Sequence, residues 1–65
     1  EIAIESSKII NRIEIIDNLG QMVYMADNIN YKTINISTIN WSTGVYYVKI
    51  YCDRKVFTEK ILIKN

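Results

Sequence analysis

Three carboxylates are the first candidates for chemistry in this 65-residue chain: Glu14, Asp17 and Glu59. A glycosidase-type pair needs two carboxyl groups that flank one cleft, about 5–10 Å apart. The three lie on separate segments, and no sequence pattern brings two of them together. The chain has no His and a single Cys, which excludes zinc sites, Cys–His pairs, Ser-His-Asp triads and internal disulfides. We therefore expect no enzyme, no metal site and no cofactor.

A row of aromatic and basic residues is the second candidate. Tyr47, Lys49 and Tyr51 alternate along one segment and could stack on sugar rings or bases. A cross-strand aromatic ladder explains the same pattern and is the stronger interpretation. Trp41 is either a ligand platform or, more simply, a lid over one end of the core. Cys52 continues an apolar face and is expected to be a small buried hydrophobe.

Composition places these residues on a β-rich domain. Fourteen Ile, four Val and four Thr make about a third of the chain β-branched, which suits a pleated sheet. Pro is absent, so we expect the seven Asn to supply turns because Asn tolerates left-handed backbone. A net charge of +1 does not indicate the strongly basic surface that nucleic-acid-binding proteins have. No apolar run is long enough to span a membrane. Residues 1–65 are expected to form one domain. Because the sequence begins with Glu1 and not with Met, we expect this domain to be a fragment of a longer protein.

Alternating apolar residues predict six strands separated by turn signals. The expected strands are Glu1–Glu5, Arg12–Asp17, Gln21–Ala26, Thr33–Ser37, Val45–Cys52 and Val56–Ile63. Asp17 to Gly20, Asn40 to Gly44 and Asp53 to Arg54 are the expected turns. The segment from Ile9 to Asp17 is ambiguous, because Ile9, Ile13 and Ile16 also have helical spacing, but its β-branched density favours a strand from Arg12 to Asp17. The spacing predicts an antiparallel β-sandwich.

Alternation also predicts which side chains face the core. The inward set comprises Ile34, Ile36, Tyr46, Val48, Ile50, Phe57, Ile61 and Ile63. Glu59 fits the inward face of its strand badly, and Lys49 marks the wetter face of the preceding one. In the third strand, Met22 and Tyr24 are expected on one face, with Val23 and Met25 on the other.

Three pieces of the sequence carry a resemblance. They are IEIIDNLGQMVY (Ile13 to Tyr24), ISTINWSTGVYYVKI (Ile36 to Ile50) and FTEKILIKN (Phe57 to Asn65). In this order and spacing, the chain resembles the type A C-terminal sorting domain of type IX (Por) secretion substrates in Bacteroidetes. Members usually open with a Pro-Asn-Pro strand, which this chain lacks. We expect that strand to be missing, leaving an open sheet edge through which two copies could pair.

The resemblance implies an immunoglobulin-like antiparallel β-sandwich of six to seven strands that directs a fused N-terminal cargo. The cargo would pass the periplasm, cross the outer membrane through the translocon and reach the cell surface or medium, and a surface sortase would remove the domain. Residues carried over for translocon or sortase recognition are Gly44, Tyr46, Val48, Lys49, Phe57, Thr58, Lys60, Ile61, Ile63 and Lys64, with Asp17 and Gly20 in a structural turn.

Two other functions stay open from the sequence. A small carbohydrate-binding or adhesive module would expose Tyr47, Tyr51 and Trp41 on one flat face, and a spacer domain would bind nothing. A sorting signal differs from both because deleting Phe57 to Asn65 should strand the cargo in the periplasm.

Overall fold

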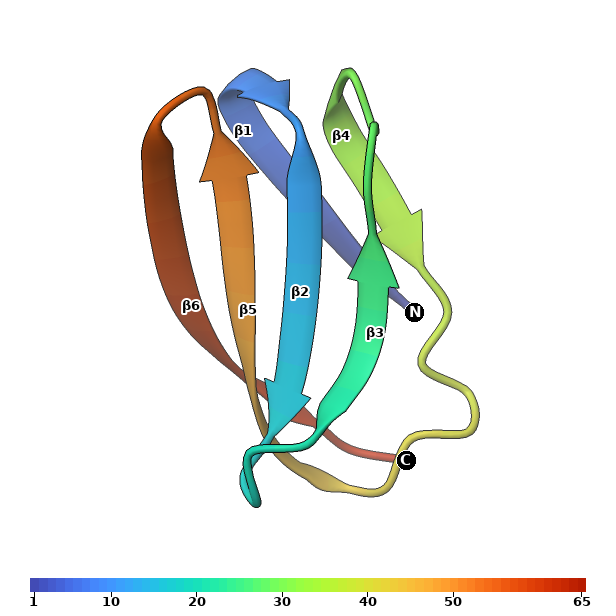
Figure 1. Ribbon diagram of the computed structural model, residues 1–65. Coiled ribbons are helices and arrows are strands. Elements are labelled where there is room, and N and C mark those ends of the chain that lie inside the picture. Colours follow the sequence, from blue (N-terminus) through green and yellow to red (C-terminus); the bar gives the residue numbers. More distant parts are fainter.

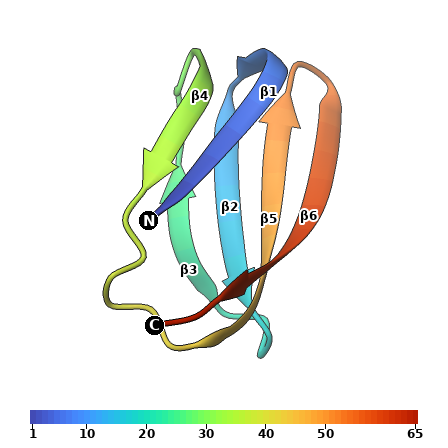
Figure 2. The same ribbon diagram turned by 180° about the vertical axis from the view of Figure 1, so that it is seen from behind.

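The computed structural model has six strands and no helix, in two antiparallel sheets (Figure 1). The strands are β1 (Ile2–Ile10), β2 (Arg12–Asp17), β3 (Met22–Ala26), β4 (Tyr31–Ile36), β5 (Gly44–Cys52) and β6 (Lys55–Ile63). The larger sheet has the order β3-β2-β5-β6, and β1 pairs with β4 in the smaller one. Seen from behind, β1 and β4 lie in front of the larger sheet (Figure 2). The predicted all-β sandwich of the immunoglobulin-like kind is confirmed.

The core lies between the two sheets and consists almost entirely of alternating side chains. Its buried members are Ile4, Ile10, Ile13, Ile15, Ile36, Tyr46, Val48, Ile50, Cys52 and Ile63. The prediction for β5 is confirmed, because its inner residues are buried while the outer ones are half-buried or exposed. Cys52 is buried and free, as expected of a small hydrophobe.

Asn, Asp and Gly make the turns, as the absence of Pro requires. Every residue with positive φ is of these types: Asn28, Asn30, Asp53, Gly20 and Gly44. In the β2–β3 turn, the Asp17 carboxylate accepts hydrogen bonds from the backbone amides of Leu19 and Gln21, each at 2.9 Å. These bonds, together with the positive φ of Gly20, confirm the predicted turn.

Two predicted details of the strands are wrong. The first strand does not end at Glu5 but continues to Ile10, and its pairing with β4 shifts between Glu5 and Ile10. This irregularity lets Ile10 reach the core although Ser6, Ser7 and Lys8 interrupt the alternation. In β3, Ile15 pairs with Tyr24 but Ile16 pairs with Met22, so one extra residue bulges. The bulge turns Met22 away from Tyr24 to the outer face.

The inner face of β6 is only partly covered. Phe57 pairs with the buried Ile50 and shares its face, yet half of Phe57 is exposed. Next along this face, Glu59 lines an open groove between β1 and β6, together with Ile2 and Ile61. Phe57 therefore points inward as predicted, but it stays half-exposed because it borders an open cavity that Ser6 and Lys8 of β1 also line. Ile61 is half-buried and Ile63 fully buried, as predicted.

Candidate interaction surface

The residues proposed from the resemblance lie on both faces of the larger sheet, except Lys64, which is exposed after the end of β6. Phe57 and Ile61 point to the partly covered inner face, and Gly44 pairs with Ile63 at the start of β5. Tyr46, Val48 and Ile63 are buried in the core. Lys49, Thr58 and Lys60 lie on the opposite face of the larger sheet, turned away from β1 and β4. Because alternate side chains of a strand point to opposite faces, a contiguous motif divides in this way between packing and solvent.

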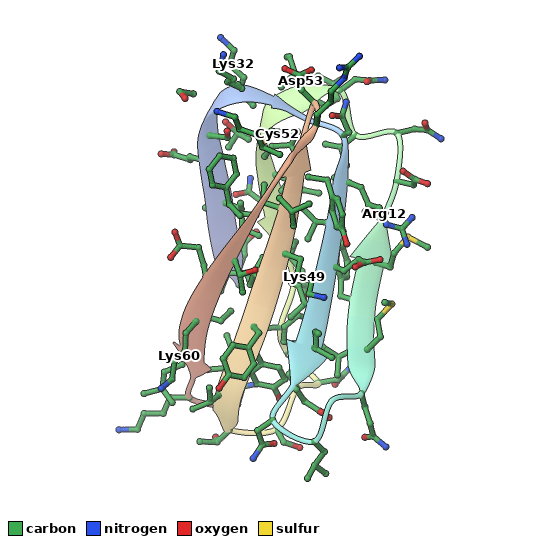
Figure 3. All side chains as sticks on the ribbon, turned by 60° about the vertical axis from the view of Figure 1, so that its left-hand side comes forward. Arg12, Lys32, Lys49, Cys52, Asp53 and Lys60 are labelled. Carbon is green, nitrogen blue, oxygen red and sulfur yellow. The ribbon has the colours of Figure 1, made fainter.

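The outward group forms a compact patch on the β5–β6 hairpin, which we call the β5–β6 outer face. It consists of four cross-strand rows, pairing Val45 with Leu62, Tyr47 with Lys60, Lys49 with Thr58 and Tyr51 with Val56. Leu62 is 71% exposed and Val56 52% exposed, so the patch mixes accessible apolar and basic side chains. Lys49 lies midway along it and Lys60 toward the lower end (Figure 3).

A hydrogen-bonded charge cluster adjoins the upper part of this face. The Arg12 guanidinium donates to Glu14 Oε2 at 2.7 Å and to Asp27 Oδ2 at 3.2 Å. The Tyr51 hydroxyl donates to Glu14 Oε1 at 2.7 Å. Donation from Tyr51 and then from Arg12 lowers the pKa of Glu14, and the bond to Glu14 raises the pKa of Tyr51. Arg12 and Tyr51 thus engage both carboxylate oxygens of Glu14.

The aromatic candidates do not gather on one face. Trp41 packs on the core side, with its ring centroid 5.2 Å from that of Tyr46 and 6.5 Å from that of Tyr24. The interpretation of Trp41 as a lid is therefore confirmed. Tyr47 is exposed on the outer face, whereas Tyr51 is half-buried and its hydroxyl is engaged by Glu14. The flat platform that a sugar binder requires is not formed.

The carboxylates considered for catalysis are likewise separated by the sheet. Glu14 faces outward from β2, and Asp17 is used by the turn. Glu59 pairs with Val48, so it lies on the inner face. No group of three or more His, Cys, Asp or Glu residues is placed to hold a metal ion. The chain contains no helix that is long and apolar enough to cross a membrane.

Two residues, Tyr46 and Asn65, hold the loop before β5, and only Asn65 was not predicted to have such a role. Tyr46 donates its hydroxyl to the Ser42 carbonyl, which anchors the loop before β5. Asn65 ties the end of the chain to the same loop. Its backbone amide donates to Thr43 Oγ1 at 2.9 Å, and the Thr43 hydroxyl donates to the Asn65 backbone carbonyl at 2.9 Å. Its side chain donates to the carbonyls of Thr38 and Trp41. No sequence signal marks Asn65, because its partners lie more than twenty positions away.

These features define a small β-sandwich whose motif residues lie along sheet faces and around no catalytic cleft. Residues 1–64 match the family model described as the secretion system C-terminal sorting domain, and the chain therefore belongs to this family. Family membership indicates a type IX secretion sorting signal of Bacteroidetes, and it implies a fused cargo, contact with the secretion machinery and export through the outer membrane. Neither a curated protein nor a solved structure matches the chain.

Proposed function

We propose that the outer-membrane translocon and the surface sortase recognise this domain through the β5–β6 outer face. The observation that carries the proposal is the position of Lys49, Thr58 and Lys60 in adjacent rows of that face. The cargo passes the periplasm with the domain attached, and the sortase removes the domain at the cell surface.

The edge position of β6 supports recognition by strand addition. β6 is the outermost strand of the larger sheet, so one side of its backbone has no strand partner. A receptor strand can pair with such an edge while the side chains beside it supply specificity. Leu62 and Lys60 point outward from this strand, giving an apolar and a basic contact.

The buried motif residues act in this proposal through folding. Tyr46 and Val48 are nearly inaccessible, so a receptor cannot read them in the folded domain. Deleting Phe57 to Asn65 would remove the buried Ile63 and most of the pairing with β5. Loss of export after that deletion could therefore be caused by unfolding of the domain or by loss of the signal. Point variants that leave the fold intact are needed to separate the two causes.

The test is an export assay with outward-facing substitutions. The chain is fused behind a periplasm-directed fluorescent reporter in a Bacteroidetes host, with and without a working translocon. We expect Lys49→Gln with Lys60→Gln to leave the reporter in the periplasm, while Lys8→Gln with Lys32→Gln, an equal charge change elsewhere, is exported. Urea unfolding of both purified chains checks that the fold is intact. Normal export of the first pair would contradict the proposal.

Removal of the domain is tested on the same exported reporter. Intact-mass measurement of material from the medium is expected to show the reporter without residues 1–65. Full-length reporter at the surface, in a host with active sortase, would show that the domain is retained.

The predicted pairing of two copies through an open edge is supported by the free edges of β1 and β6 beside the groove. Sedimentation of the chain over a range of concentrations tests it. A dimer at high micromolar concentration is expected, and a monomer throughout that range would rule out this association.

A further inference from the structure

A second feature of the molecule lies at the end of the sandwich where β5 turns into β6. An open cavity of about 490 Å³ is formed there between the end of β1 and the β5–β6 turn. Lys8, Arg54 and Lys55 line it, together with Ser6, Asp53 and Phe57. This volume lies within the range of about 300–1,000 Å³ that is usual for small-molecule sites.

The charge of the cavity is unbalanced. Three cationic side chains face a single carboxylate, Asp53. The two ion pairs of the structure both involve Arg12, so none of the three cations has an acidic partner. Lys32 also lies at this end of the molecule (Figure 3). Like charges held around one cavity repel each other, and an anion bound between them would relieve the repulsion.

The frame of the cavity is held by hydrogen bonds. Ser6 Oγ accepts the Lys8 amide at 3.1 Å and lies 3.5 Å from the Cys52 thiol. On the opposite side, the Asp53 amide donates to Asn11 Oδ1 at 2.8 Å, which fixes the turn that carries Arg54. The backbone of both walls is therefore positioned before any ligand arrives.

Phe57 supplies an apolar wall to the same cavity. It is half exposed although it points inward, because it borders this open cavity. An accessible aromatic ring beside a cluster of cations suits a ligand that has both an anionic group and a ring or an apolar face.

We propose that this cavity binds a sugar phosphate, with the phosphate held by Lys8, Arg54 and Lys55 and the sugar ring lying against Phe57. Arginine and lysine donors match phosphate oxygens, and a dianion neutralises the excess of two positive charges where a carboxylate would neutralise one. The site opens at the β5–β6 turn, beyond the rows of the β5–β6 outer face that carry Lys49 and Lys60. The proposal goes beyond the export role and does not rest on it.

The test is a titration of the 65-residue chain followed by amide chemical shifts, at constant ionic strength. Glucose 6-phosphate is expected to cause saturable shifts at residues 6–8 and 52–57, inorganic phosphate the same pattern at lower affinity, and glucose none. Shifts that fail to saturate, or that spread equally to Lys49 and Lys60, would overturn the proposal.

Matched variants separate the site from general charge. Arg54→Gln is expected to weaken binding of both phosphates about ten-fold, as loss of a charged hydrogen bond does. Lys60→Gln, the same charge change at a distance, should leave both affinities unchanged. Phe57→Leu should weaken glucose 6-phosphate but not inorganic phosphate. Equal effects of Arg54→Gln and Lys60→Gln would refute the site, and an unchanged preference for the sugar in Phe57→Leu would refute the role of the ring.

Discussion

Replacing Asn65 by alanine is expected to destabilise the sandwich by about 2 kcal/mol. The side-chain amide donates to the Thr38 carbonyl at 2.8 Å and also to the Trp41 carbonyl. Each such bond contributes about 0.5–1.5 kcal/mol net. The Thr38 carbonyl also accepts the Trp41 backbone amide at 3.0 Å and keeps that partner in the variant, so the expected effect of about 2 kcal/mol is the contribution of the two Asn65 bonds alone.

Urea unfolding followed by the fluorescence of Trp41 measures the effect. With a slope of about 1 kcal/mol per molar urea for a chain of this size, the midpoint should fall by about 2 M. Trp41 is the single Trp of the chain and lies in the loop that Asn65 holds, so its signal reports on the same region.

The neighbouring residue supplies the control. Lys64 is exposed and makes no hydrogen bond or ion pair, so Lys64→Ala should change the free energy of unfolding by less than about 0.5 kcal/mol. If Asn65→Ala behaves like Lys64→Ala, the bonds from Asn65 to the loop contribute nothing and the reasoning fails. If both variants destabilise equally, the effect belongs to the strand end and not to the Asn65 side chain.

Four further outcomes are expected. Gly20→Ala should destabilise by about 1 kcal/mol and Gly20→Asn by less, because φ is +84° there and no atom lies within 4 Å of an added Cβ; equal urea midpoints for the two variants would contradict this. Since the folded pKa of Glu14 is lowered, its contribution to stability is complete above its ordinary pKa and is lost as the pH falls through the folded value, so thermal melts of Glu14→Gln should depend less on acid than those of the native chain. Conversely, the raised pKa of Tyr51 gives stability that is complete below its ordinary pKa and is lost as the pH rises through the folded value, which Tyr51→Phe should remove from alkaline melts. Labelling of the Cys52 thiol by a water-soluble disulfide reagent should be slow in the native chain and fast in denaturant, and rapid native labelling would argue against its burial.

Several elements could be predicted because their signal is local. The bounds of β2 were predicted correctly, and those of β5 and β6 to within one residue, since alternation and β-branched density are properties of consecutive residues. The turn from Asp17 to Gly20 follows equally from short-range hydrogen bonding and a positive φ. The order of three motifs likewise sufficed for the family, which the match to residues 1–64 confirms.

The errors arose where one residue changes the parity of a strand. The bulge between β2 and β3 leaves no local mark, yet it moves Met22 to the opposite face. The inward direction of Phe57 follows from alternation, but its half-exposure does not, because alternation gives the direction of a side chain and not how closely the second sheet packs over it.

The sequence by itself determined the all-β class, the inner face of β5 and the family, because alternation, turn chemistry and motif order are local or linear properties. Only the tertiary structure decided which motif residues are accessible, that the Tyr51 hydroxyl donates a hydrogen bond to Glu14 on the neighbouring strand, and where Asn65 anchors the loop. It also decided that Lys8 and Arg54 share one cavity. These arrangements join residues far apart along the chain, so they depend on strand order, register and coverage by the second sheet, which no short stretch of sequence specifies.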